Sequence, residues 1–203
     1  MHFPREIHRP RPLNASRLVI ENFAEEVALK HGFHQTHSAG YTPNKLHALV
    51  CGLIEQLGGR FFTGPFPSKK GAGEADSLIV YATDDFVIAP SGSMAMNGIA
   101  KTQAVTNASE LGHLFLHYPV ITERVGADAV MTCPRHATDG YQEACDLEAR
   151  YFAEALIFPK AAFLTAWGHH KGDIAAIADE FDVTEGLVAN RAKRLGIILA
   201  HAA

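Results

Sequence analysis

Residues 109–117 read Ser-Glu-Leu-Gly-His-Leu-Phe-Leu-His, one residue short of the zinc-binding pattern His-Glu-x-x-His. In that pattern two histidines four residues apart stand on one face of a helix and bind one Zn²⁺, and the glutamate takes a proton from the metal-bound water. Glu110 and His113 hold the positions of the base and the second ligand, whereas Ser109 stands where the first histidine is expected. A serine hydroxyl is shorter than an imidazole and binds zinc poorly, so the segment predicts a metal site with one weakened position.

His113 and His117 form another pair of histidines four residues apart, which offers an alternative metal pair one helical turn later. This alternative places Leu114 where a glutamate is needed, so it supplies no general base. The sequence therefore favours His113 as the ligand and gives His117 a hydrogen-bonding role near the end of the helix.

A second informative segment, residues 143–160, reads Glu-Ala-Cys-Asp-Leu-Glu-Ala-Arg-Tyr-Phe-Ala-Glu-Ala-Leu-Ile-Phe-Pro-Lys. Together with the first segment it resembles the ImmA/IrrE family of metallopeptidases. In that family a His-Glu-x-x-His helix is followed by a helix of the form Glu-Ala-x-x-Phe-Ala-x-x-Leu-(apolar)-x-Pro. The resemblance runs from about Leu78 to Ile198 and implies that Glu148, which leads the second pattern, is the third zinc ligand. Ser109 is the departure from the family pattern.

This resemblance implies a zinc-dependent metalloendopeptidase that cleaves a helix-turn-helix transcriptional repressor in a stress or anti-phage response. Zn²⁺ is the implied cofactor, Glu110 the implied catalytic base, and single-stranded DNA a candidate trigger. Ser109 predicts that this chain is impaired in hydrolysis. The alternative is an inactive pseudo-protease that acts as a binding or regulatory module. A histidine replaced by serine in an engineered variant would leave the same sequence.

Cys133 is predicted to lie in a polar, irregular loop over residues 121–140, between the two helices. A thiolate is a strong zinc ligand, so Cys133 is a candidate cysteine switch that would occupy the position of the catalytic water; the alternative is a free thiol. Cys145 is the competing thiol, and its position on the second helix favours the core. Candidates for stabilising the oxyanion, chosen by residue type alone, are Tyr141, His136 and His169.

Composition describes an ordinary globular protein of 203 residues, with 47% hydrophobic and 20% charged side chains. The formal net charge of −4 argues against a broad nucleic-acid surface. Three irregularly spaced cysteines do not make a disulfide framework. The sequence lacks a run of 18 apolar residues and begins without the apolar stretch of a signal peptide, so we expect a cytoplasmic protein without a membrane segment.

The pattern of apolar residues and turn residues predicts an α+β fold, with helices packed on a small antiparallel sheet. The resemblance implies that residues 15–168 form a zincin-like metallopeptidase core. Pro119 is read as the stop signal of the helix that carries the first motif. The predicted elements are an extended arm over residues 1–14, helices over 15–30, 46–57 and 97–117, a short strand over 60–63, and a hairpin over 77–89.

Residues 169–203 have the helix, turn, helix layout of a helix-turn-helix, with Asp173 and Thr184 as helix caps. The second of these helices starts with Glu185, Gly186 and Leu187, which are poorly suited to reading bases. We therefore expect this segment to pack on the core. The basic side chains near its end, which would form at most a modest phosphate-binding patch, are Arg191, Lys193 and Arg194.

Overall fold

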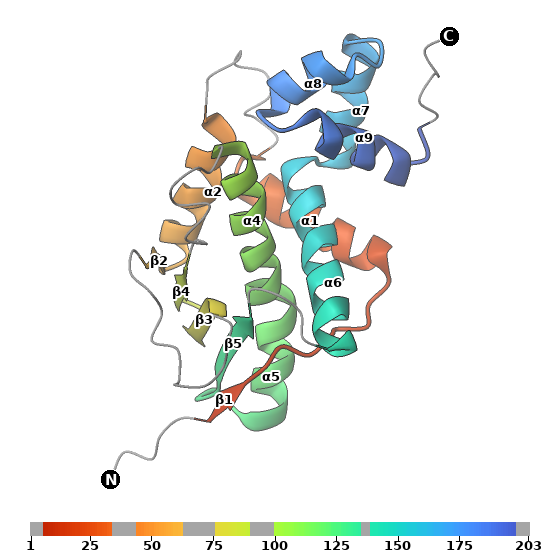
Figure 1. Cartoon of the computed structure of the whole chain (residues 1–203). Helices are drawn as coiled ribbons and strands as arrows, with labels where there is room; N and C mark the ends of the chain where they lie inside the picture. The colour runs from red at the N-terminus through yellow and green to blue at the C-terminus, as the bar shows by residue number, and fades with distance from the viewer. Residues whose placement is uncertain (1–5, 34–43, 63–75, 90–99, 135–138, 198–203) are drawn as a thin grey trace.

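The computed structural model describes residues 6–33, 44–62, 76–89, 100–134 and 139–197 (Figure 1). The helices among them are α1 (Arg17–Lys30), α2 (Lys45–Gln56), α4 (Ala100–Gly112), the π-helical turn η2 (His113–His117), α5 (Tyr118–Val125), α6 (Gly140–Ile157), α7 (Lys160–His169), α8 (Ile174–Phe181) and α9 (Glu185–Arg194). The strands are β1 (Ile7–His8), β2 (Gly59–Phe61), β3 (Asp76–Ala82), β4 (Asp85–Ile88) and β5 (Val130–Pro134). The predicted α+β class is confirmed.

The sheet has the strand order β1-β5-β3-β4-β2. Strands β3 and β4 are antiparallel, which confirms the predicted hairpin, and β3 is also antiparallel to β5. The two outer pairs, β1 with β5 and β2 with β4, are parallel. The prediction of an antiparallel sheet was therefore wrong at both edges, because the outer strands arrive from distant parts of the chain and not through tight turns.

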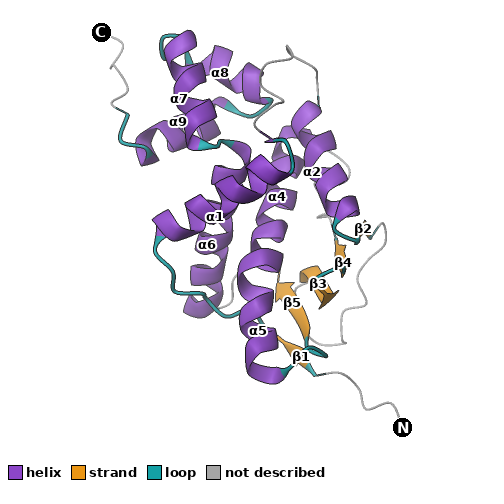
Figure 2. Ribbon diagram, turned by 180° about the vertical axis from the view of Figure 1, so that it is seen from behind, coloured by secondary structure: helices purple, strands orange, loops and turns teal. Residues whose placement is uncertain are grey.

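Helix α4 runs through the middle of the molecule, with α6 packed against it and the sheet on its other side (Figures 1 and 2). Apolar side chains from these elements form one core, in which Leu111, Phe152 and Val80 are fully buried. Among the described residues no helix combines the length and the apolar character needed to span a lipid bilayer.

The helix that carries the first motif continues past Pro119, so the prediction that it stops there was wrong. The Tyr118 N–H bonds to the carbonyl of His113, five residues back, and this wide turn joins α4 to α5. Proline lacks an N–H, which the first turn of a helix does not need, and Pro119 lies in the first turn of α5. Such π-helical turns are frequent at functional sites.

Cys133 does not lie in a loop, contrary to the sequence prediction. It belongs to β5, which pairs with the central strand β3 in register Leu78↔Cys133. The five residues of β5 are too few to show a clear alternation of apolar and polar side chains. The thiol of Cys133 is therefore held by a buried strand that faces the helices.

Gly112 allows α4 to pack directly on the backbone of α6. A Cβ added at this residue would lie 2.8 Å from both the Cα and the carbonyl oxygen of Ala149. Since His113 follows the glycine and Glu148 precedes the alanine, this contact sets how closely the two motif segments approach. We expect Gly112→Ala to lower the free energy of unfolding by about 1–3 kcal/mol, the usual cost of overpacking. Denaturant unfolding measures this change.

Gly168→Ala is the matched control, because Gly168 also lies in a helix but has no atom within 4 Å of an added Cβ. This control should be neutral or stabilising by about 0.5–1 kcal/mol, the helix-propensity difference between the two residues. Equal effects of the two substitutions would contradict the packing argument at Gly112.

The C-terminal helices α8 and α9 pack against the core through a buried arginine. Arg191 is completely buried, and it contacts Glu21 Oε1 at 3.2 Å, Glu25 Oε1 at 3.6 Å and the Phe158 carbonyl at 2.9 Å. Arg194 pairs with Glu154 on α6. Both arginines are thus used in contacts within the protein, so the prediction of a phosphate-binding patch that includes them was wrong. The same contacts pack this segment on the core, as the sequence analysis expected.

Candidate functional site

The two histidines of η2 face each other in the interior of the molecule. His113 Nδ1 lies 3.0 Å from His117 Nδ1, and both residues are buried. His117 Nε2 lies 2.9 Å from Glu148 Oε2 on α6. Because the Nε2–H of His117 donates a hydrogen bond to the carboxylate, the Nδ1 of His117 is the acceptor for the Nδ1–H of His113. His117 thus has the hydrogen-bonding role expected from the sequence, and it lies at the centre of a buried chain of hydrogen bonds.

Glu148 also anchors the segment that precedes α1. The backbone N–H groups of Leu13 and Asn14 donate to its two carboxylate oxygens, each at 2.8 Å. Burial raises the pKa of Glu148, but the hydrogen bonds from His117 and from these two backbone groups outweigh this effect and hold the pKa below its usual value. The carboxylate is therefore ionised at neutral pH, and both of its oxygens accept hydrogen bonds within the protein.

Asp146 and Cys133 lie beside the other nitrogen of His113. Asp146 Oδ1 is 3.4 Å from His113 Nε2, and the Cys133 thiol is hydrogen-bonded to the same ring. Glu110, one turn earlier on α4, is buried and adds its negative charge near this imidazole. The structure therefore brings together three predicted site residues, His113, Glu110 and Cys133, and adds Asp146 to them.

The pKa of His113 is set by opposing effects. Burial alone lowers it, but the neighbouring acidic groups, Cys133, Asp146 and Glu110, raise it above its usual range. Burial raises the pKa of the Cys133 thiol, although His113 opposes this change. Because the pKa of His113 is raised, its Nε2 carries a proton that points to the Asp146 carboxylate when no metal is bound. Binding of a metal to Nε2 would release this proton.

Ser109 does not turn toward the other predicted ligands. Its hydroxyl donates to the carbonyl of Val105, one turn earlier in α4, at 3.1 Å. Glu148 contacts His117 and not His113, since its oxygens are directed to His117 and the N-terminal segment. The ligand set of Ser109, His113 and Glu148 therefore stays a prediction.

A different pair of donors, His113 and Asp146, lies close enough to share a zinc ion. Two ligands that each lie about 2.0–2.3 Å from one zinc are at most about 4.6 Å apart. His113 Nε2 and Asp146 Oδ1 satisfy this limit, and the Cys133 sulfur lies against the same ring. Imidazole, carboxylate and thiolate are the three donor types that zinc prefers. His113 and Asp146 are thus close enough to share a zinc ion, whereas one ligand atom from each of His113, Asp146 and Cys133 cannot be chosen with all three within 4.8 Å of one another.

The remaining predicted residues lie elsewhere. Tyr141 is exposed, with the Arg11 guanidinium over its ring, and His136 falls outside the described residues. His169 ends α7, where it neighbours His170. Cys145 is fully buried, as expected of a core residue, and burial raises its pKa to about 12.

Asp146 was missed because the second motif was read only from its leading glutamate. Asp146 precedes Glu148 by two residues, which places the two carboxylates about 200° apart around the helix. They approach the histidine pair from different sides, one at His113 and the other at His117. The only signal in the sequence was the closeness of a second carboxylate to the motif.

A comparison with known protein families matches a part of the chain. Residues 99–193 match the model of the IrrE N-terminal-like domain, Peptidase_M78. A solved structure of a Mycobacterium tuberculosis transcriptional regulator is similar to this chain, with a TM-score of 0.50 and 17% identity over 86% of the chain. The match covers 47% of that regulator, so the chain spans about half of its length, and the likeness concerns the fold alone. No curated protein matches the chain.

Proposed function

We propose a function from the premise that residues 99–193 form an ImmA/IrrE metallopeptidase-like domain. In our proposal the chain is a zinc endopeptidase for a helix-turn-helix transcriptional repressor, and Ser109 makes this chain inactive in hydrolysis. One observation carries the proposal: the buried residues Glu110, His113 and Cys133 lie beside the partly exposed Asp146, while the Ser109 hydroxyl bonds back to its own helix.

In the chain as it stands the metal would be held by His113 and Asp146, and the nearby Cys133 thiol is the proposed third ligand. When bound, zinc supplies a Lewis acid that polarises a carbonyl and lowers the pKa of a coordinated water. His117 and Glu148 hold the His113 ring from behind, as carboxylate and histidine partners do for metal-binding imidazoles. Glu110 is the group that would accept the proton of the attacking water and pass it to the leaving amine.

We base the proposed substrate, a repressor cut in a stress or anti-phage response, on the resemblance to this family. The proposal that single-stranded DNA is the trigger has the same basis. The test compares this chain with its Ser109→His variant in zinc content and in cleavage of the repressor encoded beside it. Cleavage by the variant alone supports the proposal. Equal cleavage by both proteins refutes the assigned effect of Ser109.

The second candidate function is a pseudo-protease that binds its regulator without cutting it. The observation that favours it is the position of Glu148, whose oxygens are both used by His117 and the N-terminal segment. On this reading Ser109→His should leave the protein inactive even when it binds zinc and the repressor. Binding without cleavage in that variant selects this second function.

Cys133 tests how the site is regulated. In the Ser109→His background we expect Cys133→Ser to raise basal proteolysis, because a thiolate ligand would occupy the place of the attacking water. In the unaltered chain loaded with Co²⁺, the same substitution should remove the thiolate charge-transfer band from the absorption spectrum. Cys51→Ser is the control, since this half-buried thiol lies beside His47 on α2. Unchanged proteolysis and an unchanged spectrum would make Cys133 a bystander.

A further inference from the structure

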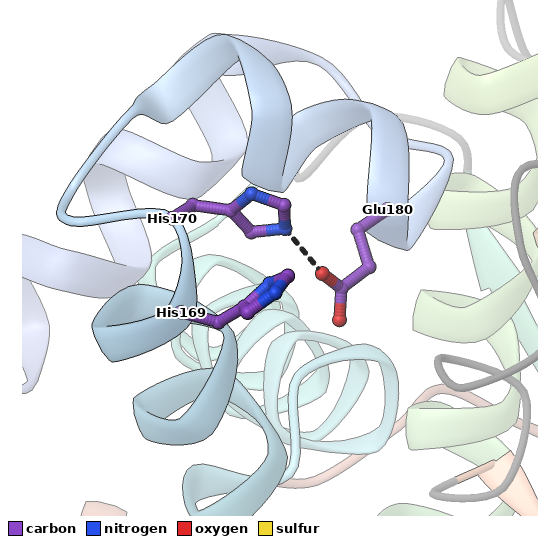
Figure 3. A group of neighbouring side chains, drawn as sticks. All are labelled: His169, His170 and Glu180. Carbon is purple, nitrogen blue, oxygen red and sulfur yellow. Dashed lines mark hydrogen bonds and ion pairs between the residues drawn. The ribbon is translucent and has the colours of Figure 1, made fainter.

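A second group of potential metal ligands lies at the junction of α7 and α8 (Figure 3). His169 is the last residue of α7 and His170 is its C-cap, while Glu180 stands in the last turn of α8. The chain reverses between the helices through Lys171 and Gly172, whose φ angles are 54° and 80°. This reversal returns α8 alongside the end of α7, so three side chains point toward one another.

The geometry of this group suits a single ion. One ligand atom from each of the three residues can be chosen such that all lie within 4.8 Å of one another. His170 Nε2 is 2.5 Å from Glu180 Oε2, and the rings of His169 and His170 have centroids 4.6 Å apart. The His170 and Glu180 side chains are 22% and 23% exposed. The group is thus open enough for an ion to enter and for water to complete its coordination.

The donor chemistry also selects the class of ion. Two imidazoles and one carboxylate bind Zn²⁺ and similar transition metals, which take three protein ligands and a water, whereas Ca²⁺ and Mg²⁺ prefer oxygen ligands. All three residues stand at the C-terminal ends of their helices, where the backbone carbonyls favour a positive charge. An ion pair accounts for His170 with Glu180 but gives no role to the second imidazole, that of His169.

We propose that His169, His170 and Glu180 bind one divalent transition-metal ion, Zn²⁺ or a close analogue. This site is separate from the one around His113, to which α7 and α8 contribute no ligand. The metal links the end of α7 to the last turn of α8. It thereby restrains the helix-turn-helix-like pair α8 and α9 relative to the rest of the fold.

The test titrates the full chain, freed of metal, with Zn²⁺ by calorimetry and with Co²⁺ by absorption. The variants are His169→Gln and Glu180→Gln. The control is His31→Gln, because the hydrogen bond described for the His31 ring joins it to Gln56 and not to a potential metal ligand. We expect each variant to lose one metal equivalent, or to bind it more than about tenfold more weakly, since even the outer partners of metal ligands are worth 10–100-fold. The part of the Co²⁺ absorption that disappears in these variants should contain no thiolate charge-transfer band. This distinguishes the ion at the cluster from an ion bound at Cys133.

Thermal unfolding gives a second, independent measurement. Zn²⁺ should raise the Tm of the unaltered chain and of His31→Gln, because a ligand that binds only the folded state stabilises it. The rise in Tm should be smaller in His169→Gln and Glu180→Gln. Circular dichroism in the absence of metal checks that each variant is folded. The proposal is overturned if both folded variants keep the stoichiometry, affinity and Tm shift of the unaltered chain, because His170 and Glu180 then form an ion pair only.

Discussion

Replacing Ser109 with histidine should tighten zinc binding at the His113 site and restore proteolysis. The new imidazole would stand four residues before His113 on one helical face, so the metal would gain a strong ligand in place of a hydroxyl that now bonds to Val105. We expect zinc affinity to rise by more than the 10–100-fold that outer partners of metal ligands contribute. Metal analysis after dialysis and repressor cleavage measure the two effects.

Glu110→Gln in the same background separates binding from catalysis. It should keep the metal and lower the rate by about 10²–10⁴-fold, the usual contribution of a positioned general base. Thr102→His is the control, because it adds an imidazole to an exposed position of α4 away from the motif. If the unaltered chain binds zinc stoichiometrically and cleaves the repressor as fast as Ser109→His does, then our account of position 109 is wrong.

Arg191→Met should destabilise the protein by about 3–5 kcal/mol, the cost of breaking a buried ion pair by removing one partner. The arginine is fully buried between α9 and α1, and its loss leaves Glu21 and the Phe158 carbonyl without this donor. Methionine keeps an apolar side chain of similar length, so packing changes little. Denaturant unfolding followed by circular dichroism measures the difference.

Lys193→Met, two residues along the same helix, provides the matched control because its side chain is exposed. That substitution should change stability by no more than about 0.5 kcal/mol. Adding Glu21→Gln to Arg191→Met should recover part of the loss, since the buried Glu21 carboxylate keeps only Arg17 as its ion-pair partner once Arg191 is gone. A loss below 1 kcal/mol in the single variant would show that Arg191 does not anchor the C-terminal helices.

Much of the framework could be predicted from local patterns. Apolar residues at helical spacing predicted α1 and α2 within two residues of their ends, and the two short apolar runs around residues 83–85 predicted the β3–β4 hairpin. The strands β1 and β5 were missed. They pair with each other across more than a hundred residues, and no local pattern records a partner so distant.

The site was predicted only in part, for a geometric reason. His113, Glu110 and Cys133 do meet, but which carboxylate of α6 faces His113 depends on the rotation of that helix. Gly112 and its contact with Ala149 fix that rotation, and the sequence motif does not contain it. The π-helical turn brings His117 against His113, and a proline two residues later is equally compatible with the end of a helix.

The bonds from Leu13 and Asn14 to Glu148 connect residues 135 and 134 positions apart. During synthesis the N-terminal segment is made long before α6, so its two backbone donors must stay hydrated until the carboxylate has emerged and the core has formed around it. Docking of this segment is therefore a late event in folding. In the folded chain one carboxylate thus links the N-terminal segment to the histidine pair.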